Sequence, residues 1–120
     1  MKKILMVDDV STNIKCVLEV LKDKYQVATA KNARLALELL AEINPDLIIL
    51  DINMPDMDGF ELLEIIKAKK EYENIPVIFL TAENDVQSEE KALGMGAAGY
   101  IMKPFGPMIL LSRIDEILAE

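Results

Sequence analysis

Short apolar runs alternate with longer amphipathic stretches along the chain, and this change of period predicts strands that alternate with helices. The predicted strands lie at residues 3–7, 26–29, 47–50, 76–80 and 99–102. In the intervals between them, apolar residues recur at helical spacing, as Ile14, Val17 and Leu21 do after the first strand. Strands that alternate with helices are typical of a parallel sheet. The pattern therefore predicts an α/β domain.

The predicted helix at residues 85–93 differs from the others in its pattern. Val86 and Leu93 are apolar, but Glu89 and Glu90 interrupt the apolar stripe between them. A helix in a globular domain is held mainly by the apolar face that it buries, so a broken stripe indicates weak docking. We expect this helix to be the least firmly docked of the predicted helices.

The length and charge of the chain restrict its fold and its partners. A chain of 120 residues, 52% of them hydrophobic, is sufficient for one domain with a sizeable core. The formal net charge of −8 argues against binding of nucleic acid, because phosphate contacts require clustered Lys and Arg. No run approaches the roughly 20 apolar residues of a membrane span. We therefore expect a cytoplasmic protein without membrane contact. The chain has a single cysteine, Cys16, which excludes an intramolecular disulfide.

Polar residues with useful chemistry follow four of the predicted strands. Asp8 and Asp9 follow the first strand, Asp51 the third, Thr81 the fourth, and Lys103 with Pro104 the fifth. In open parallel sheets, ligands bind beyond the carboxyl ends of the strands. The recurrence of such residues at four strand ends indicates one shared site rather than four separate surface residues.

Taken together, these residues resemble the site of response-regulator receiver domains, the phosphoryl-accepting modules of two-component signalling, and in particular that of the chemotaxis regulator. Strings at residues 53–59, 81–83, 96–97, 99–100 and 103–105 are also similar to strings that such domains carry. The resemblance covers residues 1–120 and implies a single receiver domain. It also implies a flavodoxin-like, doubly wound parallel sheet of five strands in the order 2-1-3-4-5, with helices on both faces.

A metal site is expected where the first and third strands adjoin. In the implied strand order Asp8 and Asp9 face Asp51, and three carboxylates that repel each other favour a hard cation such as Mg²⁺, with Mn²⁺ as the alternative ion. The resemblance implies that Asp9 and Asp51 bind the ion directly, Asn53 through its main-chain carbonyl and Asp8 through water. Alternatively, Asp8 and Asp9 only cap the following helix, which would explain one of the three aspartates but not the other two.

The resemblance further implies that Asp51 accepts a phosphoryl group from a phosphohistidine on a sensor histidine kinase or a histidine phosphotransfer protein. The Lys103 ammonium and the Thr81 hydroxyl would then stabilise charge on the transferred oxygens. Tyr100 resembles the switch aromatic of the family, and the alternation of a strand places it on the face opposite to Lys103.

The expected function is a phosphorylation-activated switch that changes the binding of a downstream protein through the fourth helix, fifth strand and fifth helix. Such a module catalyses only its own phosphorylation and autodephosphorylation, and Asn53 and Glu83 would tune the second reaction. One alternative is a receiver excised from a longer regulator with an output domain. Another is a phosphatase with an aspartyl nucleophile, but such enzymes have Asp-x-Asp after the first strand, whereas this chain has Asp8-Asp9-Val10. The sequence leaves open the kinase, the target and the isomer of the Lys103-Pro104 bond.

Overall fold

The structure, a computed structural model, describes residues 1–82 and 85–119. Within these residues the chain forms one parallel sheet of five strands in the order β2-β1-β3-β4-β5. The strands are β1 Lys3–Val7, β2 Gln26–Ala30, β3 Leu47–Leu50, β4 Val77–Thr81 and β5 Gly99–Met102. The winding direction reverses between β1 and β3, which confirms the expected flavodoxin-like order.

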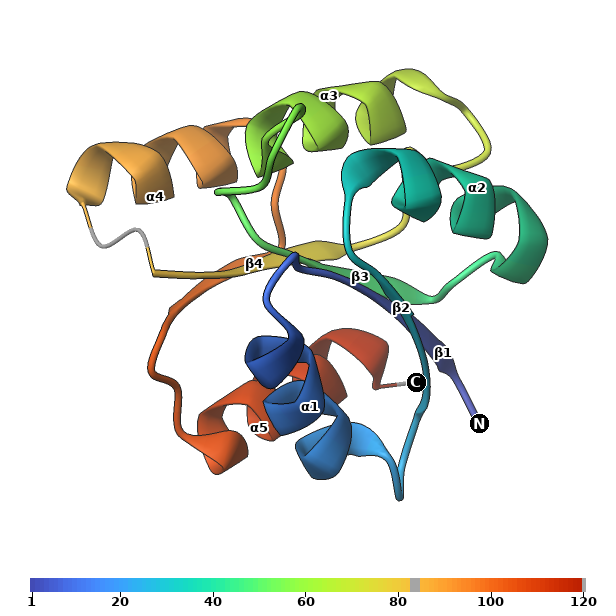
Figure 1. The fold of residues 1–120 in the computed structure, drawn as a ribbon, viewed down its shortest axis with the longest axis vertical. Coiled ribbons are helices and arrows are strands. Elements are labelled where there is room, and N and C mark those ends of the chain that lie inside the picture. The colour runs from blue at the N-terminus through green and yellow to red at the C-terminus, as the bar shows by residue number, and fades with distance from the viewer. Residues whose placement is uncertain (83–84, 120) are drawn as a thin grey trace.

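Helices cover both faces of the sheet, as Figure 1 shows. The helices α1 Ser11–Leu21 and α5 Pro107–Leu118 lie on one face, and α2 Ala33–Ile43, α3 Gly59–Ala68 and α4 Val86–Gly94 lie on the other. This arrangement follows from the parallel strands, because each connection must cross a face of the sheet before the next strand begins. In the part of the chain that the structure describes, no helix has the length and apolar character that a membrane crossing requires.

The central strands β1 and β3 are buried on both faces, so their apolar runs supply two cores. Alternate residues pack against α2 and α3 on one face: Leu5, Val7, Ile48 and Leu50. The residues between them pack against α1 and α5 on the other face: Ile4, Met6, Leu47 and Ile49. This two-sided burial explains why both strands read as continuous apolar runs rather than as alternating patterns. The burial of β1 and β3 also fixes the positions at which these strands end, where the polar residues follow.

The predicted bounds differ from the observed ones by one residue in two strands and in the helix expected at residues 85–93, which spans Val86–Gly94. β2 continues to Ala30, and β4 begins at Val77 and includes Thr81. Pro76 has no N–H to donate to a ladder, although its carbonyl accepts a hydrogen bond from Ile48 N–H at 3.0 Å. Thr81 belongs to the strand because it pairs with Met102 of β5.

Helix α4 is weakly docked, as its broken apolar stripe predicts. Ala92 is its one buried residue. Val86 and Leu93, the ends of the stripe, are 68% and 48% exposed. An Ala side chain buries little apolar surface, so α4 gains less from packing than the helices beside it.

Candidate functional site

The predicted polar residues meet at the carboxyl edge of the sheet. Asp8 and Asp51 directly follow β1 and β3, which pair in register up to their last residues. Thr81 is the last residue of β4, and its carbonyl accepts a hydrogen bond from the Lys103 N–H at 2.8 Å. The register of the sheet therefore brings side chains from four strand ends to one place.

Three carboxylates form an acidic cluster at this edge. Asp8, Asp9 and Asp51 each offer an oxygen, and these oxygens lie within 4.8 Å of one another. Asp8 and Asp51 are buried, whereas Asp9 is exposed. Oxygen ligands from several carboxylates, with one side open to water, suit a hard divalent cation such as Mg²⁺. The residues present thus fit the expected metal.

The Lys103 side chain lies between two of these carboxylates. Its Nζ is 2.6 Å from Asp8 Oδ2 and 3.5 Å from Asp51 Oδ2, and the side chain is 13% exposed. A buried aspartate next to an ammonium keeps its charge at a lower cost than an isolated one. The peptide bond from Lys103 to Pro104, whose isomer the sequence left open, is cis.

The ionisation of Asp51 depends on opposing influences. Burial raises the pKa of its carboxyl above the ordinary value, and the negative charge of Asp8 raises the pKa further. The Lys103 charge and hydrogen bonds with the Thr81 side chain and the Ile52 N–H lower the pKa. The Ile52 N–H donates to Asp51 Oδ1 at 2.8 Å. An additional cation at the cluster would favour the charged carboxylate that a nucleophile requires.

The alternative that Asp8 and Asp9 merely cap α1 is wrong. The helix begins at Ser11, and its N-cap position is occupied by Val10, which has no capping side chain. Asp8 Oδ1 instead accepts a hydrogen bond from the Val10 N–H at 2.9 Å, before the helix begins. This contact holds the carboxylate in place for Lys103 and the acidic cluster.

The segment from Asp51 to α3 is held by Gly59 and by a capping box of Asp58 and Glu61, which the sequence pattern did not assign to the site. A Cβ on Gly59 would lie 2.2 Å from the Asp51 carbonyl oxygen, so only glycine fits this approach. The Gly59 N–H donates to the Ile52 carbonyl at 2.7 Å. Asp58 and Glu61 form a reciprocal capping box at the start of α3. An acidic N-cap residue followed three positions later by Glu is a readable signal of such a box.

The two proposed switch residues lie on adjacent strands. Thr81 is fully buried. Tyr100 on β5 is half-buried, and its ring centroid is 6.2 Å from that of Phe79 on β4. Tyr100 packs on the core under α2 and α3, whereas Ile101 belongs to the core on the other face, as the strand alternation predicted.

The two residues expected to tune dephosphorylation are placed only in part. Asn53 is exposed in the loop that follows Asp51, two residues beyond it. Glu83 lies outside the described residues. The structure therefore places Asn53 near the acidic cluster, because Asn53 lies two residues after Asp51.

Comparisons with known proteins agree with this fold. The chain is 40% identical to a probable cyclic di-GMP phosphodiesterase of Vibrio cholerae over 115 residues, which cover 96% of this chain and 26% of that protein. It is 42% identical to the probable transcriptional regulator ycf29 of Pyropia yezoensis over 119 residues, which cover 98% of this chain and 54% of that protein. The chain thus spans about a quarter to a half of the length of these relatives.

A solved structure of the chemotaxis protein CheY4 of Vibrio cholerae is similar over nearly its whole length. The TM-score is 0.91 with 35% sequence identity, and the match covers 98% of this chain and 99% of that one. The family model of the response regulator receiver domain matches residues 4–115. The chain belongs to this family, the receiver domains of two-component response regulators.

Proposed function

We propose that this receiver domain is a switch in which Asp51 accepts a phosphoryl group from a phosphohistidine of a sensor histidine kinase or a histidine phosphotransfer protein. The observation that carries the proposal is the acidic cluster with the Lys103 ammonium against Asp8 and Asp51. A buried carboxylate with a fixed cation beside it has the environment of a phosphoryl acceptor rather than of a surface residue.

The reaction forms a bond between an Asp51 carboxylate oxygen and phosphorus while the bond from phosphorus to the donor's imidazole nitrogen breaks. Negative charge in the transition state spreads over three equatorial oxygens. Lys103 would neutralise part of this charge, because its Nζ is already 3.5 Å from Asp51 Oδ2 at rest. The Thr81 hydroxyl, which shares a hydrogen bond with Asp51, would donate to another oxygen. Lys103 therefore needs little reorganisation, and a charge that is already in place is a main source of electrostatic catalysis.

Mg²⁺, or Mn²⁺ in its place, is the proposed cofactor. Asp9 and Asp51 would bind it directly, Asn53 through its main-chain carbonyl, and Asp8 through water. When bound, the ion neutralises charge on the phosphoryl oxygens. Lys103 already offsets part of the repulsion between Asp8 and Asp51, which allows the cluster to persist without the ion.

The proposed output is a change in the surface formed by α4, β5 and α5, which a downstream protein reads. Thr81 and Tyr100 connect the site to this surface, because they lie on the neighbouring strands β4 and β5. The weak docking of α4 supports this route, since a loosely held helix can shift at small cost. Autodephosphorylation, tuned by Asn53 and Glu83, would return the switch to rest.

The domain fits two arrangements, as part of a longer regulator or as a separate protein. The phosphodiesterase and the transcriptional regulator named above are longer than this chain, so a receiver that controls an output domain of a longer regulator fits as well as a separate module. In either case we propose action in the cytoplasm, with no contact to nucleic acid through this domain. The chain would act on no substrate other than its own phosphoryl group.

The proposal is tested by phosphoryl transfer from labelled acetyl phosphate in the presence of Mg²⁺. Asp51→Asn should abolish labelling, since the variant lacks the nucleophilic oxygen. Asp56→Asn is the matched control, because Asp56 is exposed in the same loop and outside the acidic cluster, and asparagine tolerates its positive φ of 71°. The control should be labelled like the wild type. Efficient labelling of Asp51→Asn at another residue would contradict the assignment.

A further inference from the structure

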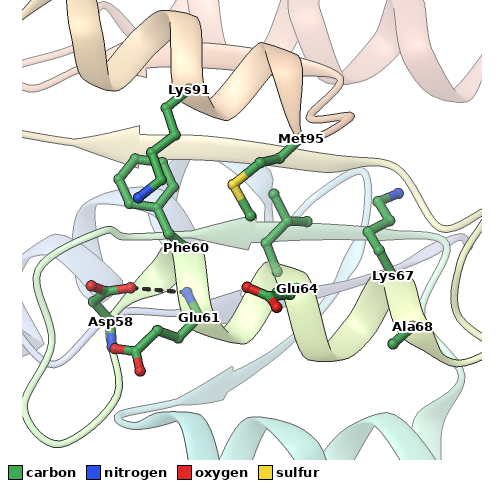
Figure 2. Close-up of a pocket in the computed structure, with 9 residues that line it drawn as sticks. Asp58, Phe60, Glu61, Glu64, Lys67, Ala68, Lys91 and Met95 are labelled. Carbon is green, nitrogen blue, oxygen red and sulfur yellow. Dashed lines mark hydrogen bonds between the residues drawn. The ribbon is translucent and has the colours of Figure 1, made fainter.

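A groove separates α4 from α3 where the two helices lie side by side. Its volume is about 590 Å³, and the residues that line it include Phe60, Lys67, Lys91 and Met95 (Figure 2). Its lining is mixed, because the carboxylates of Asp58, Glu61 and Glu64 line it beside the apolar side chains and the two lysines. Because α4 buries only Ala92, this open groove leaves the position of the helix dependent on the few contacts that cross it.

Lys91 is the residue of α4 that crosses the groove to α3. Its Nζ lies 4.4 Å from the centroid of the Phe60 ring, and Figure 2 shows the lysine side chain extending from α4 onto that ring. This distance is within the range in which an ammonium is attracted by the negative face of an aromatic ring. The contact joins the last turn of α4 to the first turn of α3.

Phe60 also stands at one end of a line of aromatic rings. Its centroid is 5.4 Å from that of Phe79 at an interplanar angle of 52°. Phe79 in turn packs on Tyr100 at 6.2 Å and 48°. Phe79 is fully buried and lies two residues before Thr81 on β4. Because the buried Phe79 ring lies between the half-buried rings of Phe60 and Tyr100, a movement of Tyr100 would displace Phe79 and be felt at Phe60.

We infer that the contact between Lys91 and Phe60 is a latch that holds α4 against α3 in the unphosphorylated domain. The line from Phe60 through Phe79 to Tyr100 connects this latch to the switch residues. The role of the latch in signalling rests on the proposed function, but its presence at rest does not. A different explanation is that the aliphatic part of Lys91 only covers the ring, in which case the charge would not matter.

Lys91→Met distinguishes these explanations, because it keeps a long unbranched side chain and a similar helix propensity but removes the charge. In unphosphorylated protein, amide hydrogen exchange in α4 should become about two- to fivefold faster, which corresponds to the loss of one exposed cation–π contact. Exchange in α2 should not change. Lys70→Met, at an exposed position outside the groove, is the matched control and should behave like the wild type.

Phe60→Leu completes a double-mutant cycle. This variant should accelerate exchange in α4 as well, and Lys91→Met should add little in its background, since the ring is already absent. Wild-type exchange in Lys91→Met would overturn the latch. So would a full additional effect of Lys91→Met in the Phe60→Leu background, which would show that the two residues act separately.

Proton NMR gives a second readout that does not depend on exchange. An ε-methylene group held over a ring face is shielded, so the Lys91 resonance should lie upfield of those of the other lysines and return to their position in Phe60→Leu. An unshifted wild-type resonance would overturn the latch. Asp51→Asn should keep the shift, because the latch is a property of the resting domain. Failure of the phosphorylation proposal, seen as labelling elsewhere, is therefore distinguishable from failure of the latch.

Discussion

The helices α3 and α4 lie side by side on the same face of the sheet, yet they are held in very different ways. Both begin with an aspartate N-cap, Asp58 or Asp85, whose side chain accepts a backbone hydrogen bond. After this shared start they diverge, because α3 buries Gly59, Leu62, Leu63 and Ile66, whereas α4 buries Ala92 alone. The two N-caps are thus similar apart from the reciprocal bond from Glu61 on α3, and the main difference lies in the apolar surface that each helix buries.

The difference coincides with what precedes each helix in the chain. α3 follows the segment that carries the proposed acceptor, Asp51, and the close approach of Gly59 to the Asp51 carbonyl fixes that segment. α4 follows β4, which ends at the proposed switch residue Thr81. A rigid helix suits a residue that must be positioned, and a loosely docked helix suits an element that must respond. In the proposed switch, α3 would thus position the acceptor segment, and α4 on the same face of the sheet would respond.

The largest effect is expected from truncating one leucine in each helix. Leu62→Ala on α3 should lower the free energy of unfolding by about 2–5 kcal/mol, because it leaves a cavity at a fully buried site. Leu93→Ala on α4 removes a half-exposed side chain and should change it by less than about 1 kcal/mol. Urea denaturation of both variants measures the contrast. Equal losses would show that α4 is docked as firmly as α3.

A smaller pair of opposite effects is expected from two glycines. Gly59→Ala should destabilise the domain by about 1–3 kcal/mol, because the new Cβ meets the Asp51 carbonyl oxygen at 2.2 Å. Gly94→Ala at the end of α4 meets no atom within 4 Å and should stabilise by up to about 1 kcal/mol through helix propensity. Thermal unfolding provides the comparison, and a neutral Gly59→Ala would remove the argument that this approach fixes the acceptor segment.

The smallest change in stability is expected at Asp9, whose effect should appear in metal binding instead. Asp9→Ala should weaken Mg²⁺ affinity about tenfold or more, the loss expected for one charged ligand. The metal-free protein should be no less stable, because one repelling charge has been removed. Calorimetric titration measures the affinity, and Asp23→Ala, at an exposed position beyond the C-terminal end of α1, is the control. Unchanged affinity in Asp9→Ala would refute the ligand role.

Much of this picture could be predicted from the sequence, because it depends on periodicity and on strand ends. The apolar runs of β1 and β3 required burial on both faces, and a parallel register then brings the residues that follow them together. Asp8, Asp51 and Lys103 were predicted at one edge for this reason, and the structure places them there. The weak docking of α4 was predicted from Glu89 and Glu90 in its stripe, since the missing apolar surface is visible in the sequence.

Contacts between distant side chains could not be predicted in the same way. The sequence marks Gly59 as the start of a helix, but its approach to the Asp51 carbonyl depends on the path of the intervening loop. The contact of Lys91 with Phe60 depends on how far α4 lies from α3, which no local pattern encodes. The Lys103-Pro104 isomer was open because the two forms differ little in intrinsic energy.

The central claim is that phosphorylation of Asp51 moves α4 and its neighbours through Thr81. The most direct measurement compares amide chemical shifts with and without beryllofluoride and Mg²⁺, in the wild type and in Thr81→Ala. In the wild type we expect the changes beyond the acidic cluster to concentrate in residues 85–109, while α2 stays unchanged. Thr81→Ala should still bind the phosphoryl mimic and lose this response. A full response in Thr81→Ala, or wild-type changes centred on α1 and α2, would contradict the account.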